Sequence, residues 1–255
     1  MAMAQEPEAV AEALAESTDE RPATRNKVRG KVREKRRQQS SEHPAAFSRP
    51  IIAAVVELLE DDPPARILDP FAGVGLVHEI ADKLGADSIG FEIEPEWASM
   101  HERTVCADSR KLTRSMTGSF DGVVVSPTYG NRMADHHDAQ DESDRATYRH
   151  RLGRPLTEGN TGGLAWGDEY RALHLAVWRR VVNLLAPGGR FVLNVKDHFR
   201  DGRRIPVSGW HVRTLLELGL TYMDDNATAT RGLGGAGDNA DAREGVEHVY
   251  LLMKN

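Results

Sequence analysis

Short apolar segments alternate with amphipathic helical patterns from about residue 43 to the end of the chain. Seven segments are typical of strands: 66–69, 88–92, 104–107, 122–126, 190–195, a segment near 220–224, and 246–253. Helical patterns lie at 50–59, 76–84, 95–103, 168–185 and 208–218. Short apolar strands with intervening helices require a parallel sheet that is covered on both faces. The sequence therefore predicts an α/β fold with a doubly wound, mostly parallel, seven-stranded sheet.

The composition is that of a globular protein large enough to bury a core. Of its 255 residues, 40% are apolar and 28% are charged. The longest apolar runs, such as 123–125 and 191–193, fall far short of the roughly 20 residues that a membrane-spanning helix requires. The start of the chain lacks the pattern of a signal peptide, and the single cysteine, Cys106, suits a reducing compartment. We therefore expect a cytoplasmic protein in which Cys106 is a small buried apolar residue.

Charge is distributed unevenly at the start of the chain. Residues 1–20 carry six acidic groups and no basic group, whereas residues 21–37 carry nine basic groups and one acidic group. With few large apolar side chains, residues 1–24 are expected to form a disordered acidic tail. Residues 25–42 are expected to form a basic arm that neutralises phosphates of a nucleic acid through Lys27, Arg29, Lys31 and Arg33. The alternative is a solvated charge run without a partner.

A ligand site is indicated where the first strand ends. The strand finishes at Asp69 and is followed by a Gly-x-Gly turn, Gly73 and Gly75, that leads into a helix. Glycines there let the backbone approach a ligand at the carboxyl end of a strand. A nicotinamide-binding fingerprint would require a third glycine at the position of His78. Because an anionic Asp69 would repel a pyrophosphate, the pattern favours a ligand that carries an ammonium group.

Acidic residues also end the next two predicted strands. Glu92 follows the second strand, where a carboxylate can hold ribose hydroxyls, and Asp108 follows the third. Each acid alone is equally typical of a helix N-cap. Three acids in succession at the tips of consecutive strands favour a ligand site over three caps.

With these motifs the sequence resembles the class I S-adenosylmethionine-dependent methyltransferases over roughly residues 43–255. Its Asp-Pro-Phe-x-Gly-x-Gly form is similar to the branch that methylates exocyclic amino nitrogens of DNA bases, N4 of cytosine or N6 of adenine. The resemblance implies a Rossmann-like class I fold and S-adenosylmethionine as cofactor. It places the methionine part of the cofactor near Asp69 and the glycine turn, the ribose at Glu92 and the adenine amino group at Asp108. The full implied cofactor set is His43, Pro44, Asp69, Phe71, Gly73, Gly75, Glu92 and Asp108.

Two of these residues lie upstream of the first strand. His43 and Pro44 precede a helix and are similar to a segment that closes over the methionine end of the cofactor in some members of the family. The alternative is a loop that starts the helix and packs Phe47 against it.

The fourth predicted strand runs into Ser126-Pro127-Thr128-Tyr129, which is similar to the family signature (Asn/Asp/Ser)-Pro-Pro-(Tyr/Phe). An exocyclic amine is a poor nucleophile because its lone pair is delocalised into the ring. Two acceptors, the Ser126 side chain and the Pro127 carbonyl, favour a pyramidal nitrogen that can attack the methyl group directly. Tyr129 can stack on the base once it leaves the duplex. Thr128 stands where the family has a second proline, which predicts a looser loop; the alternative is a plain turn without catalytic function.

Two long connections, 130–167 and 226–245, interrupt the alternation of strands and helices, and connections of this length tend to be functional. The first carries basic residues that we expect to contact nucleic acid: Arg132, Arg149, Arg151 and Arg154. The alternative is pairing of these arginines with the acidic residues of the same connection: Asp135, Asp138, Asp141, Glu142 and Asp144. The adjacent residues His136, His137 and Asp138 are not expected to bind one metal ion. The Lys196-Asp197 pair has a structural or a substrate-binding role, and the sequence does not choose between them.

The sequence thus predicts a methyltransferase domain at 43–255 that acts on double-stranded DNA with a flipped target base. Ser126 favours cytosine N4 over adenine N6. The alternatives are a tRNA or rRNA base methyltransferase and a catalytically impaired homologue that only binds nucleic acid. A small-molecule substrate would leave the basic arm without a purpose. We expect no metal and no membrane partner, and the oligomeric state is left open.

Overall fold

The computed structural model describes residues 47–130, 147–200, 203–229 and 246–255. All of them belong to one compact unit, Gln39–Asn255. The predicted acidic tail and basic arm lie outside the described residues, as do parts of the two long connections. Among the described residues, no helix is both long and apolar enough to cross a membrane.

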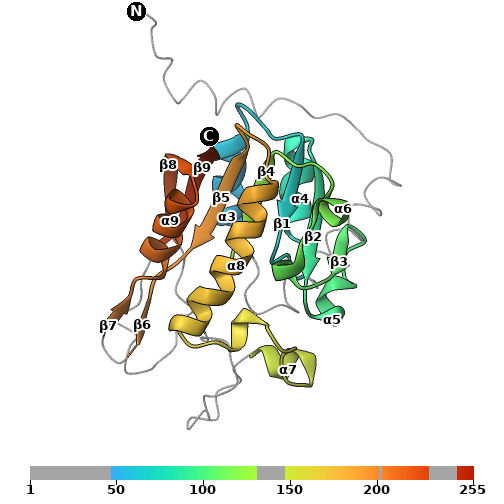
Figure 1. Ribbon diagram of the computed structural model, residues 1–255, viewed down its shortest axis with the longest axis vertical. Coiled ribbons are helices and arrows are strands. Elements are labelled where there is room, and N and C mark those ends of the chain that lie inside the picture. The colour runs from blue at the N-terminus through green and yellow to red at the C-terminus, as the bar shows by residue number, and fades with distance from the viewer. Residues whose placement is uncertain (1–46, 131–146, 201–202, 230–245) are drawn as a thin grey trace, which may run out of the picture. The chain divides into compact units, whose positions relative to one another are not determined.

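Seven strands form one sheet in the order β3-β2-β1-β4-β5-β9-β8 (Figure 1). Neighbours from β3 to β5 are parallel, whereas β9 is antiparallel to both β5 and β8. The strands are β1 Arg66–Asp69, β2 Asp87–Glu92, β3 Thr104–Cys106, β4 Gly122–Val125, β5 Arg190–Val195, β8 Leu220–Ala229 and β9 Val246–Lys254. The predicted doubly wound, mostly parallel, seven-stranded sheet is confirmed.

Helices cover both faces of the sheet. They are α3 Arg49–Leu59, α4 Val77–Leu84, α5 Pro95–Ala98, α6 Arg114–Thr117, α7 Tyr148–Leu152, α8 Asp168–Leu184 and α9 Val207–Glu217, with the 3-10 turns η1 Ser109–Lys111 and η3 Thr161–Gly163. In Figure 1, α8 lies in front of the sheet and α3 behind it. Strand β4 shows why both faces need cover, since Val123 and Val125 pack on one side and Val124 packs on the other.

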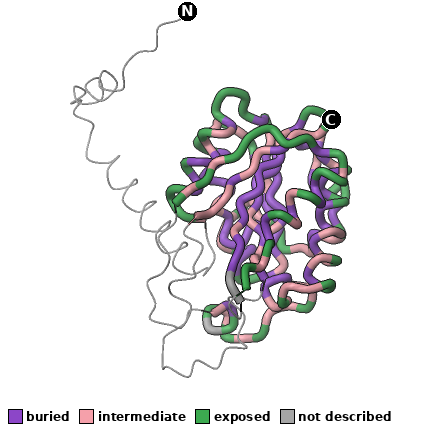
Figure 2. The backbone as a smooth tube through the Cα atoms, turned by 90° about the vertical axis from the view of Figure 1, so that its left-hand side faces the viewer, coloured by how far each residue is buried: buried purple, intermediate pink, exposed green. Residues whose placement is uncertain are grey.

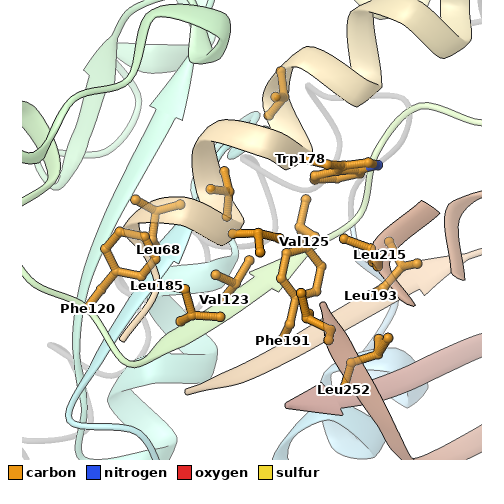
Figure 3. Packing of buried hydrophobic residues seen from close by; sticks show 14 of the residues in the cluster. Leu68, Phe120, Val123, Val125, Trp178, Leu185, Phe191, Leu193, Leu215 and Leu252 are labelled. Carbon is orange, nitrogen blue, oxygen red and sulfur yellow. The ribbon is translucent and has the colours of Figure 1, made fainter. Parts of the chain in front are cut away.

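The larger core lies between the sheet and α8 with α9. Trp178 of α8 and Leu215 of α9 pack there against Val125, Phe191 and Leu193 from the central strands (Figure 3). The smaller core packs α3 and α4 on the opposite face. Figure 2 shows the strands as the buried centre of the domain, with exposed residues on the outer helix surfaces. These two cores fix the strand ends at which the predicted site residues lie.

The structure differs from the sequence prediction in several elements. The predicted helix 95–103 ends at Ala98, after which the ring of His101 stacks on His78 with 4.0 Å between the ring centroids. Strand β8 continues to Ala229, so the second long connection begins later than residue 226. A hairpin of β6 His198–Arg200 and β7 Arg203–Ile205 follows β5.

The prediction for Cys106 is wrong, and the first long connection contains regular structure that was not predicted. Cys106 is exposed on β3 rather than buried, because β3 is an edge strand of the sheet. The described part of the first long connection is structured: it contains α7 and η3, and Tyr148 of α7 packs edge-on against Trp97 with 5.5 Å between ring centroids. Long connections can therefore form part of the core even where periodicity is weak.

Candidate active site

The predicted site residues meet where the order of the strands reverses. From β1 the chain continues to β2 and β3 on one side, and later to β4 and β5 on the other, so β1 and β4 are neighbours at the reversal. Asp69 is the last residue of β1, and Ser126 directly follows β4. Open α/β sheets bind ligands at this point, outside the carboxyl ends of the strands.

Hydrogen bonds connect the first glycine turn to the end of β2. Glu92 Oε2 accepts from the N–H of Gly73 at 2.9 Å, and Glu92 Oε1 accepts from the N–H of Glu94 at 2.8 Å. Asp69 Oδ1 accepts from the N–H of Phe71 at 2.9 Å. The structure therefore brings together four predicted cofactor residues, Asp69, Phe71, Gly73 and Glu92.

The two carboxyl groups of this cluster are buried. Burial raises the pKa of Asp69 to about 8 and that of Glu92 to about 7, against the lowering effect of the N–H donors. Among the described residues neither carboxylate forms an ion pair with a basic side chain. A buried carboxylate needs a positive partner to remain ionised. A ligand with an ammonium group, such as the methionine part of S-adenosylmethionine, fits this site.

The glycine turn is shaped by neighbouring side chains as well as by its backbone. Gly73 has a φ of 52° and Gly75 a φ of 84°, in the left-handed region that glycine adopts without strain. A Cβ at Gly75 would lie 2.8 Å from the Cβ of His101 and 2.9 Å from the Cδ2 of His78. Gly75 is therefore required by two histidines that pack on it, a reason that the sequence did not indicate.

Asp108 has the capping function that the sequence left open. It is the N-cap of η1, where its side chain accepts from the N–H of Arg110 at 2.9 Å. The Arg110 guanidinium also pairs with both carboxylate oxygens, at 2.7 Å to Oδ2 from its Nη2 and 2.9 Å to Oδ1 from its Nε. Although partial burial opposes it, hydrogen bonding to Arg110 lowers the pKa of Asp108. Contact with the adenine amino group stays a prediction for this residue.

The loop after β4 is held by polar groups from distant strands. Ser126 Oγ lies 3.0 Å from Tyr129 Oη, and Asn194 Nδ2 of β5 donates to both oxygens at 3.2 Å. Tyr129 Oη donates to Glu247 Oε1 of β9 at 3.1 Å. Burial raises the pKa of Tyr129 well above its ordinary value, so the phenol keeps its single proton. Pro127 is buried between Ser126 and Thr128.

This arrangement determines what Ser126 can still bind. Because Tyr129 gives its proton to Glu247, Ser126 is the donor to Tyr129 and receives one hydrogen bond from Asn194. A hydroxyl has two acceptor lone pairs, so Ser126 Oγ retains one for a ligand. Asn194 Oδ1 is buried and has no hydrogen-bond partner in the described part of the chain. Neither Asn194 nor Glu247 was predicted from the sequence. The signal that could have indicated Asn194 is its position as a polar residue inside the apolar run of β5.

Thr128 does not loosen the loop as predicted. Its Oγ1 donates to Thr161 Oγ1 at 2.8 Å, and its carbonyl oxygen accepts from the hydroxyl of Tyr170 at 2.5 Å. The residue is therefore fixed at its side chain and at its backbone by partners from η3 and α8.

The predicted basic contacts separate into two groups. Arg149 and Arg151 are exposed on α7. Arg154, which follows α7, donates to Glu94 Oε2 at 2.7 Å and to Glu96 Oε1 at 2.8 Å, and Glu94 is fully buried. Arg154 is thus paired within the protein, although its acidic partners lie outside its own connection and the acids predicted to pair with it lie outside the described residues. The remaining predicted contacts, Arg132, Lys27, Arg29, Lys31 and Arg33, lie outside the described residues, as do His43 and Pro44 of the cofactor set.

Asp197 has a structural role in the described hairpin and helix. Its Oδ1 accepts from the N–H of Ser208 at 2.7 Å, at the start of α9, and its Oδ2 pairs with Arg204 of β7 at 3.0 Å. Within the described ranges, no group of three or more His, Cys, Asp or Glu side chains is arranged to hold a metal ion. Residues 136–138, which were not expected to bind a metal ion, lie outside those ranges.

Comparisons with known proteins agree with the observed fold. Residues 6–103 match the family model described as DNA methylase, which is less than half of the chain and ends before the loop at Ser126. The structure is similar to TrmN from Thermus thermophilus, with a TM-score of 0.50 and 18% identity over 86% of this chain and 53% of TrmN. This chain therefore spans about half the length of TrmN.

A second solved structure with a similar arrangement is the 1,6-didemethyltoxoflavin-N1-methyltransferase from Burkholderia thailandensis. Its TM-score is 0.49 and its identity 17%, over 100% of this chain and 93% of that protein. The search of curated proteins finds no matching sequence. The chain therefore has the Rossmann-like fold of class I methyltransferases, and its residues 6–103 match the DNA methylase family model.

Proposed function

We propose that the protein is an S-adenosylmethionine-dependent methyltransferase that methylates an exocyclic amino nitrogen of a base in DNA, N4 of cytosine or N6 of adenine. The observation that carries this proposal is the free acceptor lone pair of Ser126 beside the anchored ring of Tyr129, at the sheet edge next to Asp69. The match of residues 6–103 to the DNA methylase model supports it independently.

The cofactor would be held by the cluster at the ends of β1 and β2. When bound, S-adenosylmethionine supplies an electrophilic methyl group. Asp69 provides the negative charge for the methionine ammonium group, and ionisation of this buried carboxyl is favoured by that partner. Each Glu92 oxygen accepts one backbone N–H and has a second lone pair for a ribose hydroxyl. Asp108 is proposed to contact the adenine amino group, and His43 with Pro44 to close over the methionine end.

The target amine would be held by the loop after β4. Ser126 Oγ and the Pro127 carbonyl accept the two amino hydrogens, which favours a pyramidal nitrogen with its lone pair directed at the methyl group. Tyr129 offers its ring to stack on the flipped base while Glu247 holds the hydroxyl. Methyl transfer would then be a single displacement at the methyl carbon, without a covalent enzyme intermediate. The amine nitrogen would form the new C–N bond as the sulfonium C–S bond breaks, and the nitrogen would release one proton to solvent.

The proposed partner is double-stranded DNA. The basic arm at 25–42 and the exposed Arg149 and Arg151 would neutralise backbone phosphates. Helix α7 lies at the same end of the sheet as the β6–β7 hairpin, which continues directly from β5 (Figure 1). Arg154 is not among these proposed phosphate contacts, because its guanidinium pairs with Glu94 and Glu96.

A methylation assay with isotope-labelled cofactor tests the proposal on matched DNA and RNA, followed by nucleoside analysis. We expect N4-methylcytosine or N6-methyladenine in the DNA digest. Label that enters only RNA would replace the proposal with the RNA methyltransferase alternative. Cofactor binding by calorimetry without transfer to either polymer would favour the impaired, binding-only homologue.

A further inference from the structure

We infer that a buried relay of three side chains, Trp178, His211 and Tyr170, positions the catalytic loop at Thr128 and takes over the stiffening role of the missing second proline. The relay joins α8 and α9 to the backbone of the loop. This inference rests on the proposed function, because it assigns the relay to the site where the target amine would be held.

The hydrogen bonds of the relay run in one direction. Trp178 Nε1 donates to His211 Nδ1 at 3.0 Å, His211 Nε2 lies 2.9 Å from Tyr170 Oη, and Tyr170 Oη donates to the Thr128 carbonyl oxygen at 2.5 Å. An indole nitrogen can only donate, so His211 Nδ1 must accept. A neutral imidazole then has its proton on Nε2, which donates to Tyr170 and leaves the phenol proton for Thr128.

Burial keeps each member in the protonation state that this direction requires. Trp178, Tyr170 and His211 are fully buried. Burial lowers the pKa of His211 well below its usual value, and the neighbouring His174 lowers it further. Burial also raises the pKa of Tyr170 well above its usual value. A neutral imidazole and a protonated phenol are therefore the stable forms at neutral pH.

Thr128 is also held from a second side. Its hydroxyl donates to Thr161 Oγ1, and Thr161 is almost fully buried in η3. The η3 segment is fixed in turn by Asn160, whose Nδ2 donates to the buried Glu94 at 2.7 Å. A proline at position 128 would restrict one backbone dihedral angle. Thr128 is instead held by two tertiary hydrogen bonds, one through its hydroxyl, which a proline would lack, and one through its backbone carbonyl, and they orient the residue between Pro127 and Tyr129.

The position of the relay distinguishes it from ordinary core packing. Its last acceptor is the Thr128 carbonyl oxygen, in the loop two residues from Ser126. Loss of the Tyr170 hydroxyl is therefore expected to release the loop while the surrounding aromatic packing is retained. Phenylalanine at position 170 keeps the ring contacts with Trp166 and His174 and removes the hydroxyl, which is both the donor to Thr128 and the acceptor for His211 Nε2.

The first test is single-turnover methylation by Tyr170→Phe in the full chain, with Tyr250→Phe on β9 as the matched control. We expect Tyr170→Phe to slow the chemical step by about tenfold, the effect of one lost hydrogen bond that orients the reacting group. The cofactor dissociation constant, measured by calorimetry, should stay within about twofold of wild type. A Tyr170→Phe rate equal to that of wild type would overturn the inference.

A double-mutant cycle tests whether the relay and a proline at position 128 restrict the loop in the same way. In a Thr128→Pro background, Tyr170→Phe should cost less than about threefold in rate, because the proline ring restricts the loop without the relay. Equal losses in both backgrounds would show that the relay and the proline position are independent, which contradicts the inference.

Hydrogen exchange provides a readout that does not depend on methylation. Tyr170→Phe should accelerate exchange of the amides at 128–130 by about tenfold and leave the amides of β1 and β4 unchanged. Equal acceleration in the loop and in the strands would indicate a loss of global stability and overturn the inference. If the wild type methylates no nucleic acid, the proposed function fails, and the exchange pattern still decides whether the relay holds the loop.

Discussion

The phenolic oxygen of Tyr129 lies 3.0 Å from Ser126 Oγ and donates its proton to Glu247 Oε1, a residue 118 positions further along the chain. The tyrosine ring is thus anchored at its far end while its hydroxyl lies beside the proposed amine acceptor. This relationship separates the two functions of Tyr129, stacking through its ring and orientation through its hydroxyl.

Substitutions at Tyr129 test that separation. Tyr129→Ala should weaken binding of the flipped base by about 1–3 kcal/mol, because the stacking platform is lost. Tyr129→Phe retains the ring and should recover most of this loss. Fluorescence of 2-aminopurine at the target position measures the flipped and stacked base in each variant. An equal signal from Tyr129→Ala and wild type would contradict the stacking role.

Stability of the cofactor-free protein should depend on pH through Asp69. The native pKa of about 8 lies above the ordinary value of 3.8, so the native state binds this proton more tightly than the unfolded chain. The contribution of Asp69 to stability is therefore full below pH 3.8 and is lost as pH rises through about 8. Urea unfolding of wild type and Asp69→Asn across this range is the measurement. We expect a flatter pH profile for Asp69→Asn, and identical profiles would contradict the raised pKa.

Asp108 is expected to serve both the fold and the cofactor. Asp108→Ala should lose about 1 kcal/mol of stability with the N-cap of η1. Cofactor affinity should fall by about 1 kcal/mol as well, because the acceptor for the adenine amino group is removed. Asp108→Asn keeps an acceptor oxygen for both contacts and is the control. If Asp108→Ala loses stability but binds the cofactor with wild-type affinity in calorimetry, only the capping role of Asp108 remains.

Removal of residues 1–37 should weaken binding to nucleic acid and reduce its salt dependence. The slope of log affinity against log salt should become shallower by about 0.9 for each phosphate that the arm no longer neutralises. Arg154→Gln is a control that should leave this slope unchanged, since Glu94 and Glu96 already engage the guanidinium. A slope unaffected by the truncation would identify the arm as a solvated charge run.

The central strands were predictable because burial determines their composition. Runs such as Val123–Val125 are apolar on both faces because helices cover both faces of the sheet. The strands predicted from such runs therefore differ little in their bounds from the observed β4 and β5. The edge strand β8 was harder to predict from the sequence. Strand β8 continues through Asp224, Asp225 and Asn226, which are polar residues with low strand propensity. The β6–β7 hairpin was missed although an Asp-Gly pair at 201–202 is a hairpin signal in the sequence.

The site was predictable where residues follow strand ends and unpredictable where contacts join distant parts of the chain. The placement of Asp69, Glu92 and Ser126 at one edge was predictable because the carboxyl ends of parallel strands meet there. The contacts of Tyr129 with Glu247 and of Thr128 with Tyr170 leave no local pattern, because each partner also suits an ordinary strand or helix position. The pairing of Arg154 with Glu94 was unpredictable for the same reason, since Glu94 lies 60 residues earlier.

The most direct test of the account is the single-turnover rate of base methylation by Ser126→Ala at saturating cofactor, with Ser115→Ala on the exposed helix α6 as control. If Ser126 Oγ accepts a hydrogen of the target amine, the chemical step should slow by about tenfold or more, while affinities for cofactor and DNA change little. Nucleoside analysis of the wild-type product should give N4-methylcytosine or N6-methyladenine. Equal single-turnover rates for wild type and Ser126→Ala would contradict the proposed catalytic role of the loop.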